Sequence, residues 1–277
     1  MASNIIVARG GVEFVPPVSL AFWRWLTVFL ILLPFFFNEI SKKKQELKKE
    51  SFQFFLLGLT GCAICGAFPF IAGMSTTMAN MGIIYTSSPI FIIFLSVLFF
   101  KDKINISRII GLIICIIGVL VIICKGEISY LFNLKFTSGD LWMLGAAIGW
   151  AVYSIFLINW KSKFSLMARF TLIALFGSIC LFPFYILEQI YFIQTVFSKY
   201  FLFWVLFAAI SPGIIAFSLY TKAQKYLGAS LTGFTLYIFA IYSAIYGIIL
   251  FNEPLLGFHY YGSLLVFAGI FLARKVI

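Results

Sequence analysis

The chain has few charged residues for its length. Only 10% of its 277 residues are charged, against about 25% in an average soluble domain. Its hydrophobic content of 63%, with a mean hydropathy of +1.09, excludes a disordered chain and exceeds what a soluble fold of this size can bury. Nucleic-acid binding is excluded as well, because the 20 Lys and Arg residues occur in short clusters between apolar runs. A membrane protein with many spans remains.

Catalytic and metal-binding motifs are also scarce. The chain has one His, His259, and it lacks a nucleophile elbow, a zinc-protease motif and a nucleotide-binding glycine loop. We expect His259 to lie at the membrane interface, with a proton relay as the alternative. Cys62 and Cys65 have redox-motif spacing, but their apolar surroundings favour small buried residues over redox or metal chemistry. We therefore predict no cofactor, no metal site and no ATP hydrolysis by this chain.

Long apolar runs are what the chain does have. Ten of them fall at about 1–14, 17–38, 52–73, 79–100, 108–124, 139–159, 166–187, 200–221, 229–251 and 258–273. Most are near the ~20 residues that cross a bilayer, and they must be helices because backbone amides in hydrocarbon need internal partners. The predicted fold class is therefore an all-α membrane protein with ten transmembrane helices.

The basic residues predict the orientation of these helices. If the N-terminus is inside, the inside gaps hold fifteen Lys and Arg residues, and the outside gaps hold three, Lys125, Lys135 and Lys199. This asymmetry predicts that both termini are cytoplasmic. The lysine-rich run at 42–50 is then predicted to be a solvated cytoplasmic loop.

The two halves of the chain resemble each other. An offset of 151 residues aligns Ala72/Ala223, Gly82/Gly233, Phe100/Phe251, Gly111/Gly262 and Gly118/Gly269. An offset of 149 aligns Ala2/Ala151, Pro34/Pro183 and Phe35/Phe184. Each half would hold five helices, and an odd number inverts the second half, as in many secondary transporters. We expect a first repeat at 1–125, an outer linker at 126–138 and a second repeat at 139–277.

Several short motifs resemble one membrane-protein family. They are Ala2-Ser3-Asn4, Val15-Pro16-Pro17, Arg24 followed by Leu32-Leu33-Pro34, Ser87-Ser88-Pro89, Lys101-Asp102-Lys103 and Asn252-Glu253-Pro254. In their order and spacing they are similar to EamA-type transporters of the drug/metabolite transporter superfamily. The resemblance implies a ten-helix inverted-repeat carrier in the inner or plasma membrane, often an exporter of amino acids or related compounds. Family members usually begin with a complete first helix, so the first segment, ~21 Å long by helical rise, is expected to be truncated.

Three charged residues of the first two apolar runs are the most informative: Arg9, Glu13 and Arg24. Arg9 and Glu13 share one helix face, and Arg24 is expected at a similar depth to Arg9. Two interpretations stay open, a structural Arg–Glu pair that reaches the outer surface and a cavity-facing anion site. Glu13 is the candidate for proton coupling. Its positive neighbours would keep it ionised, which favours facilitated diffusion or exchange over proton coupling.

Polar and helix-breaking positions predict a central cavity, because a Pro in a membrane helix frees a carbonyl that a cavity can satisfy. Two such positions are Tyr85–Pro89 and Ser211–Gly213. The candidate substrate-binding residues are Asn4, Arg9, Arg24, Tyr85, Ser88, Trp150, Tyr153, Ser154, Ser211, Thr235 and Tyr237. Asp102 and Glu253 are predicted to be helix caps instead, and the repeated glycines are predicted to allow close helix packing.

The predicted function is a carrier that moves small metabolites through this cavity by alternating access. Its expected partners are a small-molecule substrate and the lipid bilayer, with no nucleic acid and an oligomeric state that the sequence does not define. A non-transporting scaffold or channel is one alternative, and an intramembrane enzyme is another.

Overall fold

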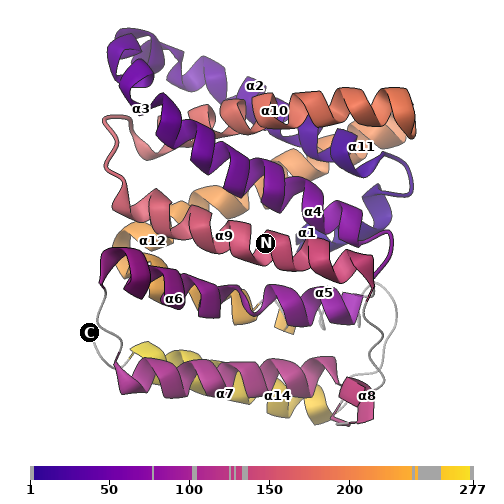
Figure 1. Ribbon diagram of the computed structural model, residues 1–277, viewed down its shortest axis with the longest axis vertical. Coiled ribbons are helices and arrows are strands. Elements are labelled where there is room, and N and C mark those ends of the chain that lie inside the picture. The colour runs from indigo at the N-terminus through magenta and orange to yellow at the C-terminus, as the bar shows by residue number, and fades with distance from the viewer. Residues whose placement is uncertain are drawn as a thin grey trace.

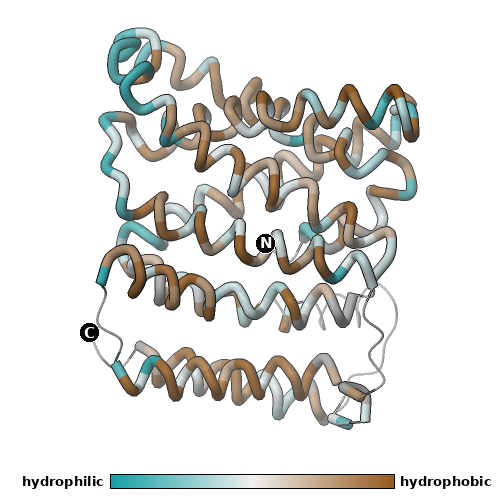
Figure 2. Tube along the Cα trace, in the orientation of Figure 1, coloured by the Kyte–Doolittle hydropathy of each residue, from teal (hydrophilic) through white to brown (hydrophobic). Residues whose placement is uncertain are grey.

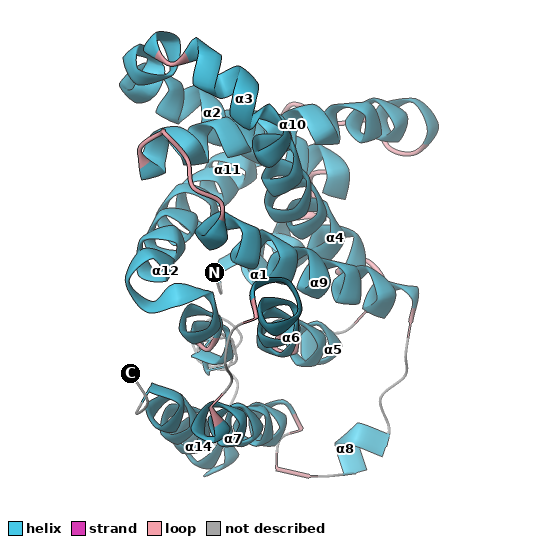
Figure 3. Cartoon of the chain, turned by 60° about the vertical axis from the view of Figure 1, so that its left-hand side comes forward, coloured by secondary structure: helices cyan, strands magenta, loops and turns pink. Residues whose placement is uncertain are grey.

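The computed structural model describes residues 3–76, 78–101, 105–124, 126–127, 129–132, 137–238, 241–242 and 257–274. All regular secondary structure within these ranges is helical, which confirms the predicted all-α class (Figure 3). The long helices lie side by side, and their connections lie at two opposite ends of the molecule (Figure 1).

The first half of the chain contains α1 (Ser3–Ile6), η1 (Val7–Gly11), α2 (Pro17–Lys42), α3 (Lys44–Leu57), η2 (Gly58–Ile64), α4 (Cys65–Ala72), α5 (Met78–Tyr85), α6 (Ser88–Phe100), α7 (Ile106–Ile123) and α8 (Ser129–Phe132). The second half contains α9 (Ser138–Asn159), α10 (Leu166–Tyr191), α11 (Lys199–Ala208), η3 (Ala209–Ile215), α12 (Ala216–Gly233) and α14 (Gly257–Arg274). Elements labelled η are π-helical. Within α12, Gly228 has a φ of 78°, so this element is two helices that meet at a kink.

Five helical stretches in the described part of the chain are long and apolar enough to cross a membrane. They are Pro17–Lys42, Lys44–Ala72, Ser138–Asn159, Leu166–Tyr191 and Lys199–Ala229. Shorter apolar helices lie at Ser88–Phe100, Ile106–Ile122 and Tyr260–Ala273. Polar residues gather where the helices end, and apolar residues fill their middle sections (Figure 2). This distribution matches an apolar slab between two aqueous surfaces.

Local sequence signals define where the helices begin. Pro17 begins α2 directly after Pro16, at a position where the missing amide hydrogen costs little. Asp140, in the first turn of α9, accepts a hydrogen bond of 2.6 Å from the amide of the N-cap residue Thr137. The Ser165 hydroxyl caps α10 by accepting a hydrogen bond from the Ala168 amide, and the Ser198 hydroxyl caps α11 by accepting one from the Phe201 amide.

One predicted loop is helical instead. The run at 42–50 was expected to be a solvated loop, but α3 begins at Lys44 and α2 continues to Lys42. Only Lys43 separates them, with a φ of −109° that breaks the helical path. The prediction was wrong because the charge of the run was taken to exclude helix, whereas Lys, Glu and Gln are good helix formers. In addition, Glu50 is 7% exposed and holds a neighbouring loop.

The predicted fourth segment, 79–100, is interrupted near its middle. The α-helix stops at Tyr85, and a new helix begins at Ser88 with Pro89 in its first turn. Proline lacks the amide hydrogen that the preceding turn would need, so the break follows directly from Pro89. The sequence had singled out this stretch as a place where the helix opens.

Two helices at one edge of the molecule, α7 and α14, meet through glycines (Figure 1). A Cβ atom at Gly111 would lie 2.6 Å from the Gly269 carbonyl oxygen, and one at Gly118 would lie 2.7 Å from the Gly262 carbonyl oxygen. Residue numbers rise along one helix as they fall along the other, so the pair is antiparallel. Only glycine permits backbones to approach this closely, in agreement with the predicted packing role.

Two carboxylates connect α2 and α10 by hydrogen bonds, one at each end of the pair. Glu188, near the end of α10, accepts hydrogen bonds from the amides of Val18 (2.9 Å) and Ser19 (2.6 Å) and from the Ser19 hydroxyl (2.6 Å). Glu39, near the end of α2, accepts from the Ser165 amide (2.8 Å) and the Ser165 hydroxyl (2.6 Å). Each carboxylate therefore caps the first turn of the opposite helix. The two helices run antiparallel, with one cap at each end of the molecule.

Candidate functional site

A small cavity lies among the described helices and is the candidate substrate site. Its volume is about 30 Å³, and it is lined by Asn4, Ala8, Arg24, Cys65, Pro69, Met81, Tyr85, Met143, Trp150 and Phe217. These residues come from both halves of the chain. A space of this volume holds about one water molecule. A metabolite therefore fits only after the surrounding helices move apart.

Arg24 brings a positive charge to this cavity. Its side chain is 2% exposed, and its Nη1 donates a hydrogen bond of 2.8 Å to the Asn4 side-chain oxygen. Its guanidinium carbon lies 4.6 Å from the centre of the Trp25 ring, a cation–π contact, while its Nε has no hydrogen-bond partner. Among the described side chains, no carboxylate lies within 4 Å of Arg24. The guanidinium thus faces the cavity with unused hydrogen-bonding capacity.

Aromatic rings form one side of the cavity. Trp150 lies 5.2 Å from Phe217 and 4.8 Å from Tyr220, measured between ring centres. Tyr153 packs behind Trp150 at 5.3 Å. The Tyr220 hydroxyl and the Ser154 hydroxyl are 2.9 Å apart and hydrogen-bonded. Along α9, Tyr153 follows the cavity-lining Trp150 toward the helix end at Asn159, and along α12 Tyr220 follows the cavity-lining Phe217.

Each of the three described π-helical segments adjoins the cavity. Ala8 lies within η1, Cys65 directly follows η2, and Phe217 lies two residues after η3. A π turn widens the helix and leaves carbonyl groups without their usual partners, and such turns occur frequently at functional sites. Gly213 of η3 also lies beside Arg24, because a Cβ atom there would be 3.8 Å from its Nε.

The structure places four of the predicted residues, Asn4, Arg24, Tyr85 and Trp150, in the wall of the cavity. Tyr153 and Ser154 lie in the adjoining aromatic cluster. Of the cavity-lining residues that sequence reasoning missed as substrate contacts, Cys65 had been predicted to be a small buried residue. Ala8, Met81, Met143 and Phe217 have no polar signal that could have singled them out.

The other predicted site residues lie elsewhere. The Ser88 hydroxyl donates to the Tyr85 carbonyl oxygen at 2.7 Å, and the Ser211 hydroxyl donates to the Ser3 hydroxyl at 3.1 Å. Thr235 is exposed, and Tyr237 is buried in a separate cluster with Cys115 and Val266, between α7 and α14.

The remaining predictions for charged and polar residues concern Glu13, Arg9, His259, Asp102 and Glu253. Glu13 is exposed in the turn that follows η1. The side chains of Arg9 and His259 lie outside the described part of the structure, and so do Asp102 and Glu253. All five cysteines are buried, with free thiols.

Comparisons with known proteins agree with this architecture. A family model described as the EamA-like transporter family matches residues 1–124 and 137–274. The protein YyaM of Bacillus subtilis, named an uncharacterized transporter, is 28% identical over 150 residues, which cover 54% of this chain and 49% of YyaM. An uncharacterized transporter of Archaeoglobus fulgidus is 28% identical over 154 residues, covering 56% of this chain and 52% of that protein. The match thus spans about half the length of each relative.

Two further matches extend over nearly the whole chain. YetK of Bacillus subtilis, also named an uncharacterized transporter, is 24% identical over 272 residues, which cover 98% of this chain and 82% of YetK. A solved crystal structure superposes with a TM-score of 0.76 over 99% of this chain and 92% of that chain, at 17% sequence identity. That structural likeness shows a shared fold.

The helical fold, with several helices long and apolar enough to cross a bilayer, is that of a multi-pass membrane protein. The family match covers most of both halves of the chain, so the chain belongs to the EamA-like transporter family.

Proposed function

We propose that the chain is a carrier that binds small carboxylates, such as amino acids or related compounds, in the cavity at Arg24 and moves them by alternating access. The observation that carries the proposal is a buried guanidinium that faces the cavity and has no carboxylate partner among the described side chains. A charge in the bilayer is costly unless it has a function or a partner, and a substrate carboxylate is a well-matched partner for Arg. The apolar and aromatic walls would hold the remainder of the substrate.

The proposed architecture is ten helices in two inverted five-helix repeats, with the halves at 1–125 and 139–277. Three structural correspondences support it. The π-helices η2 and η3 have the same length, and their bounds differ by 151 residues. In the α7–α14 pair, Gly111 contacts Gly269 and Gly118 contacts Gly262. The offset of 151 residues relates Gly111 to Gly262 and Gly118 to Gly269, so each contact corresponds to the other in the second repeat. The capping residues Glu39 and Glu188 are 149 residues apart, the offset that relates Pro34 to Pro183.

The proposed cycle opens the cavity to one side of the membrane and then to the other. The narrow cavity and the ring cluster of Trp150, Tyr153 and Tyr220 support a resting state that is closed on the side of the cluster. We place the chain in the inner or plasma membrane with both termini cytoplasmic, from the distribution of basic residues. The exposed position of Glu13 favours facilitated diffusion or exchange over proton coupling through this residue.

Counterflow tests the proposal directly. Proteoliposomes preloaded with an unlabelled metabolite mixture would be exposed to radiolabelled single compounds, with empty liposomes as the blank. We expect uptake of a subset of small carboxylates, and we expect Arg24→Gln to reduce it at least about tenfold because the charge-assisted contact is lost. Arg108→Gln, which removes an Arg of α7 away from the cavity, is the matched control. Absence of uptake across the panel by the wild type, or equal losses in both variants, would contradict the proposal.

A further inference from the structure

A second hollow, far larger than the central cavity, opens at the end of the molecule where α3, α9, α10 and α12 meet. This groove has a volume of about 650 Å³. Its walls include Glu50 of α3, Arg169 of α10 and Lys225 of α12, and the loop at 160–165 contributes Lys161 and Lys163. By the orientation proposed above, the groove faces the cytoplasm.

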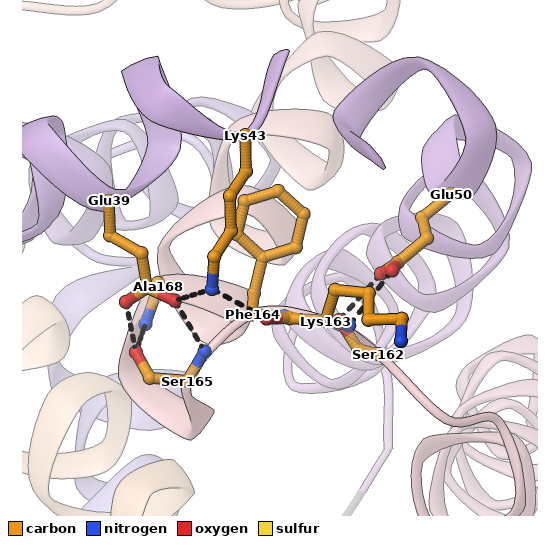
Figure 4. Close-up of polar contacts among 8 residues, drawn as sticks. All are labelled: Glu39, Lys43, Glu50, Ser162, Lys163, Phe164, Ser165 and Ala168. Atoms are coloured by element: carbon orange, nitrogen blue, oxygen red, sulfur yellow. Dashed lines mark hydrogen bonds and ion pairs between the residues drawn. The ribbon is translucent and has the colours of Figure 1, made fainter. Parts of the chain in front are cut away.

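The loop that forms the rim of this groove is held in place by two helices. Figure 4 shows that Glu50 accepts hydrogen bonds from the Ser162 hydroxyl and the Lys163 amide, the latter at 2.9 Å. On the other side of the loop, Lys43 donates to the Lys163 carbonyl oxygen at 2.6 Å and forms an ion pair with Glu39 at 2.8 Å. The backbone that carries the rim lysines is therefore fixed before any ligand arrives. Such preorganisation lowers the entropic cost of binding.

Arg169 is the unusual residue of the groove. Its side chain is only 6% exposed, and its Nη1 donates to the Leu157 carbonyl oxygen at 2.7 Å. Its Nε and Nη2 are buried and have no hydrogen-bond partner among the described residues. Glu50 also lines the groove, but both of its carboxylate oxygens already accept hydrogen bonds from the loop. A buried guanidinium with unused donors is costly to maintain unless an acceptor joins it.

The charges around Arg169 indicate which acceptor fits. Lys161, Lys163 and Lys225 are exposed, and among the described side chains no carboxylate lies within ion-pair distance of them. With Glu46 and Glu50 included, the groove lining carries four positive and two negative groups. This surplus matches a phosphate group, which carries a charge of about −1.5 to −2 as a monoester and binds Arg through two parallel hydrogen bonds.

We propose that this groove is a phosphate-binding site in which Arg169 is the buried anchor and Lys161, Lys163 and Lys225 are the surrounding cations. The phosphate group comes either from a soluble anion or from the headgroup of an anionic lipid. The site is separate from the cavity at Arg24, because Arg169 does not line that cavity and the buried rings of Tyr153 and Tyr220 lie between the two. The proposal does not depend on transport.

Thermal unfolding of the purified chain in a neutral detergent tests the site, with sodium phosphate compared against sodium chloride at equal ionic strength. We expect phosphate to raise the midpoint of the wild type. Arg169→Gln should increase the half-maximal phosphate concentration at least about tenfold, since the bidentate contact is lost. The double variant Lys161→Gln/Lys163→Gln changes exposed side chains and should weaken the response without unfolding the protein. Lys44→Gln is the matched control, because it removes an exposed charge at the same end but outside the groove.

A second arm distinguishes the sources of the phosphate group. The same titration would be made in nanodiscs of phosphatidylcholine alone and of phosphatidylcholine with phosphatidylglycerol. Loss of the phosphate response in the mixed discs assigns the groove to a lipid headgroup, whereas an unchanged response assigns it to a soluble anion. The proposal is overturned if phosphate has no effect beyond chloride, or if both groove variants respond like the wild type. Counterflow by the wild type would be unaffected by that result, so the two proposals fail separately.

Discussion

At the scale of single residues, the positive charge of Arg24 is not compensated by its hydrogen-bond partner. That partner is Asn4, at 2.8 Å, whose side-chain amide is neutral. An amide oxygen orients the guanidinium without cancelling its charge. A carboxylate in the same place would orient it equally well and would neutralise it. The cavity would then have little attraction for a second carboxylate.

The variant Asn4→Asp tests this distinction. We expect the purified variant to unfold no earlier than the wild type, because Asp has nearly the same shape and gains an ion pair with Arg24. Its affinity for a carboxylate substrate should fall at least about tenfold, as measured by the substrate concentration that gives half-maximal counterflow. Asn4→Ser is the control that removes the amide without adding charge. Unchanged affinity in Asn4→Asp would show that the charge of Arg24 does not attract the substrate.

Part of this site could be predicted from the sequence. An Arg within an apolar run is conspicuous because charge in a bilayer is rare, and its cavity partners Asn4, Tyr85 and Trp150 are polar or aromatic. Thr235 and Tyr237 have the same chemical character but lie elsewhere. Which face of a helix meets a cavity depends on its packing partners, and this information is absent from local composition. The groove was missed because Arg169, near the start of the predicted segment 166–187, was one of the fifteen basic residues assigned to the inside gaps.

At the scale of secondary structure elements, the two carboxylate caps hold the α2–α10 pair at both ends. They differ in burial. Glu188 is 8% exposed and accepts three hydrogen bonds, whereas the Glu39 side chain is 24% exposed and accepts two from Ser165. A buried acceptor is harder for water to replace than an exposed one. The two caps should therefore contribute unequally to stability.

Alanine substitution measures that inequality. Glu188→Ala leaves three donors without their acceptor and is expected to lower the free energy of unfolding by about 2 kcal/mol. Glu39→Ala is expected to cost about 1 kcal/mol, because water reaches the freed amide. Unfolding in a denaturing detergent, followed by circular dichroism, gives both values. Glu127→Ala, at an exposed position, is the control. Costs no larger than the control for both variants would mean that the caps do not stabilise the pair.

The extent of the helices could be predicted best where apolar runs have sharp polar boundaries. The predicted segments 139–159 and 166–187 agree closely with α9 and α10, which begin beside capping residues. The helix start at Lys44 was missed because the first turns of α3 are charged and come before its apolar part. The π-helical segments were missed as well, since π and α turns are built from the same residue types. Their position is decided by contacts such as that of Gly61, where a Cβ atom would clash with the Tyr153 ring.

At the scale of the whole molecule, the proposed orientation places Ser41 at the cytoplasmic end and Ser129 at the outer end. The five native cysteines are buried, so an added cysteine would be the reactive thiol in either variant. A membrane-impermeant maleimide should label Ser41→Cys only in inside-out vesicles and Ser129→Cys only in right-side-out vesicles. Labelling of the unmodified protein gives the background. Reaction of both variants from the same side would contradict the ten-helix topology.

The small volume of the central cavity also has an electrical consequence. Ions cross a membrane protein along a continuous file of water molecules. The central cavity among the described helices has a volume of about 30 Å³ and holds about one water molecule. We therefore expect a membrane that contains many copies of the substrate-free chain to have the same low ion permeability as bare lipid. The cell could then hold the protein at high density without dissipating its membrane voltage and ion gradients.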